Sequence, residues 1–413
     1  MSGKFINTEH RDNIDGLVSG LKDIMNNPYY KWNDKTGTAV EYYNQNKEAS
    51  TLDQASKLYY ADIGIESPIR YNIIEDLMLY GLDQIAISME NGDYGPEASE
   101  IAGEAIVLPN TIIPYVGDYF NIIYTEEKLL FRVTDVTPDT LENGSNIYKI
   151  QYKLESTQLE SVIKSENIED RYNMIINNLG TGFNPIIRHE SYNMIKALDK
   201  VLFDLRTYYK SIFYKSRVQT FIFVYNNQRF YDPFMIEFLK ENKLLDGDEN
   251  YIYLTQQVKL SSLFPIQYSK SFFKCLEDKD LERIHFYEHN GIAEYIEDPL
   301  SIFQTRLENY FEIKPKTCNS NFGIIPCFKD ELITAIENDE LFEGDDSVYN
   351  IIIKYFNNKT INQEDIDNLK YIDFSDNIVI FYAIPCVIYC IERFIKSLMQ
   401  DENEHNGKLT LNK

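Results

Sequence analysis

Helical spacing is the clearest regularity along the chain. Apolar residues recur every three or four positions between residues 9 and 26 and again between residues 190 and 215, a spacing typical of amphipathic helices. Ser67-Pro68 has the residue types of a helix start, and Ile69, Ile73, Ile74 and Leu77 follow at helical spacing, which predicts a third helix ending at Gly81. Shorter segments at 233–245, 330–342 and 362–372 also favour helices.

A different pattern runs from Pro114 to Ser156, where short apolar stretches alternate with turn residues. "YFNIIY", "LLFRVTDV" and "IYKIQYKLES" have the composition of strands, and Glu126-Glu127 and Asn143-Gly144 separate them. Tight turns between short strands predict a small β-barrel of the SH3 or OB kind. In the last strand, alternation places Tyr148, Ile150, Tyr152 and Leu154 together on the face toward the core.

The remaining segments suggest an α+β protein of several domains. "VQTFIFVYNNQRFYDPF" predicts a hairpin that turns at Asn226-Asn227, and "YIYLT" a further strand. Residues 29–50 are polar and aromatic without a clear period, so we interpret them as an extended arm or loop. Asn91-Gly92 and Gly95-Pro96 indicate a boundary. We therefore expect an N-terminal helical arm region at 1–100, the barrel at 101–160, an α+β segment at 161–265, and a mixed, largely helical region at 266–413.

An almost wholly apolar run, "IVIFYAIPCVIYCI" at 378–391, raises the question of a membrane span. It falls short of the roughly 20 residues that a spanning helix needs, and Pro385 interrupts it. We expect a buried helix or strand of the C-terminal core. The N-terminus also lacks the basic and apolar regions of a signal peptide.

Composition narrows the class of protein. The chain has 413 residues, 14% of them aromatic, and a formal net charge of −25. Such a charge argues against a protein that neutralises the phosphates of duplex DNA, because that affinity comes from Lys and Arg. The odd number of cysteines, 5, does not suggest a disulfide framework and fits a reducing compartment. Aromatic pairs such as Tyr42-Tyr43 are expected to pack in the core or between subunits.

Candidate catalytic chemistry is limited to one motif. His285-Phe286-Tyr287-Glu288-His289 matches the H-x-x-E-H pattern of inverted zinc peptidases, in which two imidazoles on one helix hold zinc and the Glu serves as base. Asn290-Gly291 follows at once and would end a helix there. Cys386 and Cys390 are expected to be buried thiols. There is no phosphate-binding glycine loop or nucleophile elbow, so we expect no enzyme, no cofactor and no bound metal.

The barrel segment resembles the neck, or head-to-tail connector, proteins of contractile-tailed bacteriophages. Their order of features is a proline, Gly-Asp, an aromatic strand, a turn, a strand of the "LFxVxxV" type, a turn and "YKIxxxLE". The matching residues here are Pro114, Gly117, Asp118, Phe120, Leu130, Phe131, Val133, Val136, Tyr148, Ile150 and Glu155. The resemblance covers about an eighth of the chain. The N-terminal arm and the region after Ser191 depart from the family's pattern.

The resemblance implies a non-enzymatic virion structural protein that assembles in the host cytoplasm. Its partners would be portal, neck or tail proteins and further copies of itself in a ring, without membrane or sequence-specific nucleic acid. A baseplate or other tail position is the alternative, and a zinc-dependent hydrolase is the alternative of another class. We expect the interface to include an arm around Trp32, Tyr42 and Tyr43, and barrel residues Asp118, Phe120 and Glu126.

Overall fold

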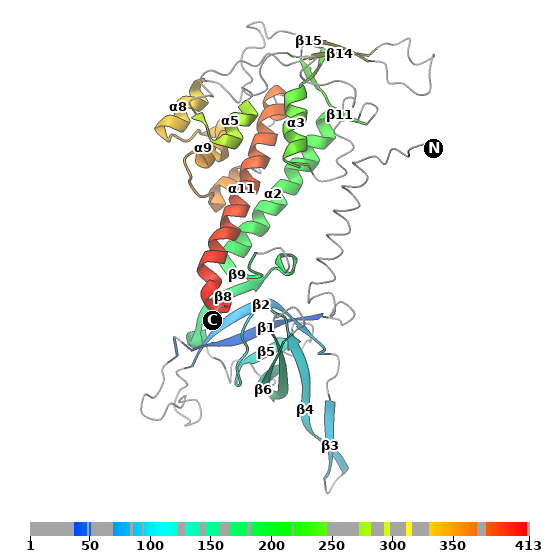
Figure 1. Cartoon of the computed structure of the whole chain (residues 1–413), viewed down its shortest axis with the longest axis vertical. Coiled ribbons are helices and arrows are strands. Elements are labelled where there is room, and N and C mark those ends of the chain that lie inside the picture. Colours follow the sequence, from blue (N-terminus) through cyan, green and yellow to red (C-terminus); the bar gives the residue numbers. More distant parts are fainter. Residues whose placement is uncertain are drawn as a thin grey trace, which may run out of the picture. The chain divides into compact units, whose positions relative to one another are not determined.

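In a computed structural model, the chain divides into two compact units (Figure 1). Unit 1 comprises residues 1–193 and 398–413, and unit 2 comprises residues 194–397. The structure describes residues 37–47, 49–50, 69–82, 86–92, 95–122, 129–140, 146–156, 163, 165–179, 183–216, 219–225, 227–245, 272–281, 293–297, 311–315, 330–369 and 377–410.

Unit 1 is built on a nine-stranded sheet in the order β3-β4-β7-β6-β5-β1-β2-β8-β9. Its strands are β1 (Gly37–Asn46), β2 (Arg70–Tyr80), β3 (Ala86–Gly92), β4 (Gly95–Val107), β5 (Tyr119–Ile122), β6 (Leu130–Thr140), β7 (Asn146–Ser156), β8 (Ile168–Met174) and β9 (Ile186–Arg188). An additional pairing of β2 with β4 closes the sheet into a barrel. Most neighbours run antiparallel, but β8 runs parallel to β2. The predicted small barrel is therefore confirmed.

The barrel interior is an aromatic and aliphatic core. The rings of Phe120 of β5, Phe131 of β6 and Tyr152 of β7 contact one another, and the Phe120 centroid lies 5.2 Å and 5.0 Å from the other two. All three rings are buried, and such offset and edge-to-face contacts add to the free energy of burial. Ile150 and Tyr152 are fully buried, while Tyr148 and Leu154 pack against the same core, so the predicted inner face of β7 is confirmed.

The helix predicted after Ser67-Pro68 is wrong, because residues 70–80 form strand β2. A β-bulge explains the misleading spacing. Before the bulge, Ile69, Tyr71 and Ile73 alternate on the outer face of the sheet. Ile74 faces inward before the bulge. Asp76 then adopts a left-handed conformation with φ 58°, the register shifts, and the inner face continues with Leu77 and Leu79. Two strand patterns offset by one residue thus imitate a helical period.

The arm expected at 29–50 is also corrected over its described part. Residues 37–46 are strand β1, paired with β2 and β5 inside the barrel. No period is visible because both faces are covered: Tyr42 belongs to the inner core, and Tyr43 to a second cluster outside the barrel. Asn91-Gly92 and Gly95-Pro96, interpreted as a domain boundary, lie in the β3–β4 hairpin. The helix expected at 9–26 lies outside the described residues.

Unit 2 is organised around two long helices, α2 (His189–Phe213) and α11 (Asn377–Thr410). Tyr209 of α2 donates a hydrogen bond to the carbonyl of Phe381 on α11, at 3.2 Å, and their rings are in contact. The helix expected at 190–215 is confirmed, and the burial expected for 378–391 is confirmed over its described side chains, 380–391, with Pro385 inside α11. Within the part of the chain that the structure describes, we find no helix with the length and apolarity of a membrane span.

Short elements complete unit 2. The helices are α3 (Pro233–Glu241), α5 (Phe272–Asp278), α8 (Asp330–Asn338), α9 (Asn350–Phe356) and α10 (Gln363–Leu369). The strands are β10 (Tyr214–Lys215), β11 (Thr220–Phe221), β12 (Phe223–Tyr225), β13 (Gln228–Tyr231), β14 (Ala293–Glu297) and β15 (Phe311–Pro315). The predicted hairpin is β12–β13, in which Asn227 has φ 60°, as a two-residue turn requires. The strand expected at 251–255 lies outside the described residues.

Candidate functional site

The Gly-Asp pair of the opening barrel segment forms a tight turn before β5. Gly117 has φ +92°, a conformation that favours glycine, and a Cβ atom there would lie 2.7 Å from Nε2 of Gln45. The amide of Gly117 donates to the carbonyl of Val133 at 2.9 Å, and the amide of Val133 returns a bond to the carbonyl of Asp118 at 2.8 Å. The turn is therefore tied to β6 on both sides of the glycine.

Asp118 connects this turn to β1 through its buried carboxyl group. Its Oδ2 accepts hydrogen bonds from the Tyr42 hydroxyl at 2.9 Å, from Nδ2 of Asn44 at 2.9 Å and from the amide of Tyr115 at 2.8 Å. Its Oδ1 accepts from the amide of Gln45 at 2.9 Å. The residue is 0% exposed. One side chain therefore satisfies four donors from two segments that lie more than 70 positions apart in sequence.

Burial controls the electrostatics of this carboxyl group. It raises the pKa of Asp118 to about 7, against the opposing effect of the hydrogen bonds from Tyr115, Gln45, Asn44 and Tyr42. Burial and the neighbouring Asp118 also raise the pKa of Tyr42 well above its ordinary value, which keeps its hydroxyl protonated as a donor. The carboxyl group of Asp118 therefore links the turn before β5 to β1, and its four hydrogen-bond donors all come from unit 1.

The same turn presents an apolar side chain at the surface. Val116, next to Gly117, is 57% exposed, whereas its carbonyl is held by Nε2 of Gln45 at 3.1 Å. Nζ of Lys47 lies 3.4 Å from the centre of the Tyr115 ring, a cation–π contact at the start of the turn. The backbone of the exposed tip is therefore held in place by contacts within unit 1.

The structure places the predicted interface residues unevenly. Tyr42, Tyr43, Asp118 and Phe120 are all buried in unit 1, at 2% exposure or less. Their side chains pack in the barrel unit itself, and the side chain exposed beside them is that of Val116. Trp32 and Glu126 lie outside the described residues, and their part in an interface stays a prediction.

The motif considered for catalysis cannot be placed, because His285 and His289 lie outside the described residues. Among the residues that are described, no cluster of His, Cys, Asp or Glu could hold a metal ion. Cys386 and Cys390 are free and buried in α11, and burial raises the pKa of both thiols, which makes them poor nucleophiles.

Sequence reasoning missed two sets of polar residues that organise unit 1. Asn44 and Gln45 are buried donors on β1, and polar side chains in an aromatic segment were the available signal. Near the C-terminus, the buried carboxylate of Glu402 accepts from Nε of Arg188 at 2.8 Å and from the Ser191 hydroxyl at 2.7 Å. Nothing local in sequence indicates this contact, because the partners are more than 200 positions apart.

Comparison with known proteins identifies the N-terminal part of the chain. Residues 23–188 match the model of the family described as "Putative phage head-tail joining protein". This range contains all nine strands of the sheet and the Asp118 turn. Searches among curated proteins and among solved structures give no match. The resemblance to phage head-to-tail connector proteins is thereby confirmed over residues 23–188, and the chain is a phage structural protein in which this segment is similar to the head-tail joining family.

Proposed function

We propose that the protein is a neck component that joins the head to the tail, assembled as a ring of identical copies. The observation that carries this proposal is the match of residues 23–188 to the head-tail joining family on a closed barrel. Symmetric rings form when each copy uses one surface to bind the next. Assembly in the host cytoplasm, contacts with portal or tail proteins and the absence of enzymatic activity belong to the same proposal.

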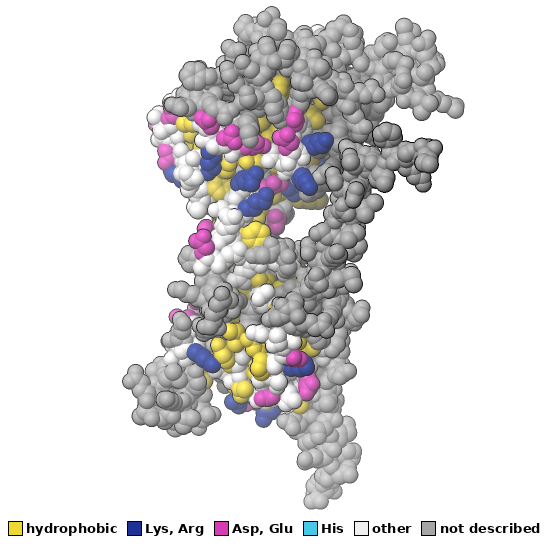
Figure 2. Space-filling view, viewed as in Figure 1, with side chains coloured by type: hydrophobic (Ala, Val, Ile, Leu, Met, Phe, Trp, Pro, Cys, Tyr) yellow, Lys and Arg dark blue, Asp and Glu magenta, His cyan; other side chains and the backbone are white. Residues whose placement is uncertain are grey.

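The surface charge agrees with an assembly role. On the face shown in Figure 2, acidic and basic side chains are interspersed over the described surface of unit 2. Binding along a duplex instead favours a continuous run of Lys and Arg. We propose protein partners, and absence of binding to single- or double-stranded DNA at low salt is the expected result.

A loss-of-function experiment tests the neck role. Phage grown without this protein should accumulate filled heads and complete, separate tails, which electron microscopy of the lysate distinguishes. Finished heads with absent or defective tails would instead favour the baseplate or another tail position. Normal joined particles would refute the neck proposal.

A point variant tests the turn as a contact. Val116→Asp places a charge on the exposed tip and should abolish complementation of the deletion while leaving the fold intact. Val224→Asp is the matched control, because Val224 of β12 is also exposed, at 44%. Equal complementation by both variants would exclude the Val116 tip from the interface. Stoichiometric zinc in the purified protein would revive the hydrolase alternative at His285 and His289.

A further inference from the structure

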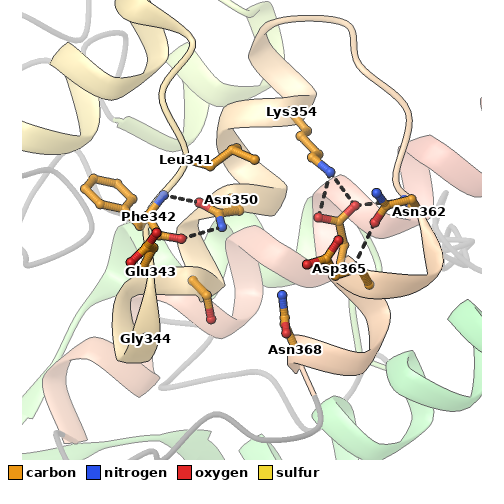
Figure 3. A pocket seen from close by; sticks show the side chains of 11 residues that line it. Leu341, Phe342, Glu343, Gly344, Asn350, Lys354, Asn362, Asp365 and Asn368 are labelled. Atoms are coloured by element: carbon orange, nitrogen blue, oxygen red, sulfur yellow. Dashed lines mark hydrogen bonds and ion pairs between the residues drawn. The ribbon is translucent and has the colours of Figure 1, made fainter.

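Unit 2 contains a cavity of about 570 Å³ that the proposed joining role does not use (Figure 3). It lies among α9, α10, the 3₁₀-helix η10 (Gly344–Tyr349) and the extended residues 341–343. Its volume falls within the usual range for sites that bind small molecules or peptide side chains. It is open to solvent on one side, since Leu341 and Asn368 on its walls are exposed.

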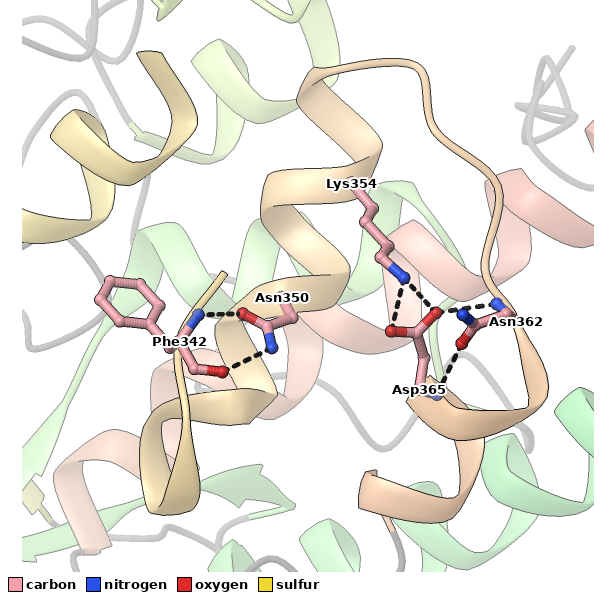
Figure 4. A network of polar contacts seen from close by, with 5 residues as sticks. All are labelled: Phe342, Asn350, Lys354, Asn362 and Asp365. Atoms are coloured by element: carbon pink, nitrogen blue, oxygen red, sulfur yellow. Dashed lines mark hydrogen bonds and ion pairs between the residues drawn. The ribbon is translucent and has the colours of Figure 1, made fainter. Parts of the chain in front are cut away.

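The floor of the cavity is a buried ion pair. Nζ of Lys354 lies 2.6 Å and 2.5 Å from the two carboxylate oxygens of Asp365, and both residues are less than a tenth exposed. Asp365 is held in turn by Asn362: the Asn362 amide donates to its Oδ2, and the Asp365 amide donates to the Asn362 side chain (Figure 4). An ammonium has three N–H donors, and within the described residues Asp365 alone accepts from Lys354.

The charge of the walls sets the class of occupant. Lys354 and Asp365 neutralise each other, which leaves Glu343 and Glu364 as the other charged residues that line the cavity. Neither carboxylate has a hydrogen-bond or ion-pair partner among the described residues. An anionic ligand would be repelled, whereas an ammonium or guanidinium group would gain from both carboxylates.

One side chain that lines the cavity, that of Asn350, already binds a main-chain N–H and a main-chain carbonyl. The side chain of Asn350 accepts from the amide of Phe342 at 2.7 Å and donates to the carbonyl of the same residue at 2.9 Å (Figure 4). Asn368 lines the cavity with an equivalent amide group that no residue of the described part occupies. A second extended segment could therefore be held by its backbone while its side chain reaches the carboxylates.

We propose that this cavity binds a lysine or arginine side chain of an extended segment from a partner protein. The cation lies between Glu343 and Glu364, the free N–H of Lys354 donates to a main-chain carbonyl of the segment, and Asn368 pairs with the adjacent peptide group. This site is independent of the joining role proposed above, so either can fail without the other.

Titration of the full-length protein with short peptides tests the site. The probes are acetyl-Gly-Lys-Gly-amide and its arginine analogue, compared with the norleucine and glutamate analogues, with binding followed by saturation-transfer NMR. The two cationic peptides should bind and the other two should bind at least several-fold more weakly. Equal binding of the norleucine peptide, or no binding of the cationic ones, would overturn the proposal. Binding of spermidine without binding of either cationic peptide would also overturn it, because the occupant would then be a free polyamine.

Variants locate the binding. Glu343→Gln with Glu364→Gln should weaken the lysine peptide roughly fivefold, since each exposed ion pair contributes a modest amount. Glu331→Gln with Glu404→Gln removes the same net charge from exposed positions outside the cavity and should leave affinity unchanged. Equal weakening by both pairs would show a general charge effect and refute the site.

Discussion

Replacing Asp118 by alanine should lower the free energy of unfolding of the barrel unit by more than a substitution of an exposed residue does. Four donors now end on this carboxyl group: the Tyr42 hydroxyl, the Asn44 amide group and the backbone amides of Gln45 and Tyr115. In the variant each of them would lose this acceptor, although Nδ2 of Asn44 keeps a second bond, to the carbonyl of Ile113. Each unsatisfied buried donor costs roughly 1–3 kcal/mol.

The low end of that range applies, because removing a buried acid also removes its own desolvation cost. Four donors at that value predict a loss of about 4 kcal/mol. This is a large part of the 5–15 kcal/mol that typically stabilises a domain. It corresponds to a fall in Tm of roughly 10 °C for the barrel unit.

Hydrogen exchange measured by mass spectrometry is the assay, because it reports on each unit separately. Peptides from residues 37–47 and 113–122 should lose protection in Asp118→Ala, while peptides from α9 and α11 in unit 2 keep theirs. Asp135→Ala is the control: this acid is exposed on β6, and its loss should change stability by less than about 0.5 kcal/mol. Wild-type protection of the β1 and β5 peptides in Asp118→Ala would refute the reasoning.

Three further predictions concern unit 1. The folded pKa of Asp118 is about 7 against an ordinary 3.8, so the folded state holds this proton more tightly, and the resulting stabilisation is full below about pH 4 and is lost as pH rises to about 7. Denaturant titrations should show the free energy of unfolding fall by on the order of 4 kcal/mol over this range. Asp118→Asn should flatten this pH dependence, and an unchanged dependence would assign it to other groups. Gly117→Ala should lower the free energy of unfolding by roughly 1–2 kcal/mol in the same titrations, because its φ is positive and a Cβ atom would meet Gln45. Asp76→Gly is the control: glycine accepts the positive φ at this position, so stability should change by less than about 0.5 kcal/mol. Equal effects of the two variants would contradict the turn geometry. Glu402→Gln should lower the free energy of unfolding by roughly 2 kcal/mol and increase hydrogen exchange of residues 183–191, since it weakens the bonds to Arg188 and Ser191. Glu404→Gln, at an exposed position, should have no effect. Protection of residues 183–191 equal to wild type in Glu402→Gln would show that the contact is dispensable.

The sequence predicted the parts of the fold in which one face is buried and one is exposed. The strands β6 and β7 and the helix α2 follow that rule, and their periods are visible. It failed for β1 and β2, which are covered on both faces and, in β2, shifted by a bulge at Asp76. A strand that is buried on both faces shows no alternation of apolar and polar residues in the sequence. For this reason β2 was interpreted as a helix and β1 as an arm.

The candidate site shows the same limit. The Gly-Asp pair was recognisable as a barrel feature, but its meaning depends on Asn44 and Gln45, which are far away in sequence. The sequence also did not indicate which side chains are exposed: Tyr42 and Phe120, which we expected at an interface, are buried, and Val116 is exposed. Aromatic residues report burial, and only the three-dimensional structure shows whether the burial is within one chain or between chains.

The central claim, that this protein joins the head to the tail, is tested most directly by locating it in intact phage particles. Antibodies against the purified protein, bound to gold and imaged by electron microscopy on disassembling virions, would give its position. The account predicts label at the junction between head and tail, in a small fixed number of copies per particle. Label at the distal end of the tail, or particles without label, would contradict it.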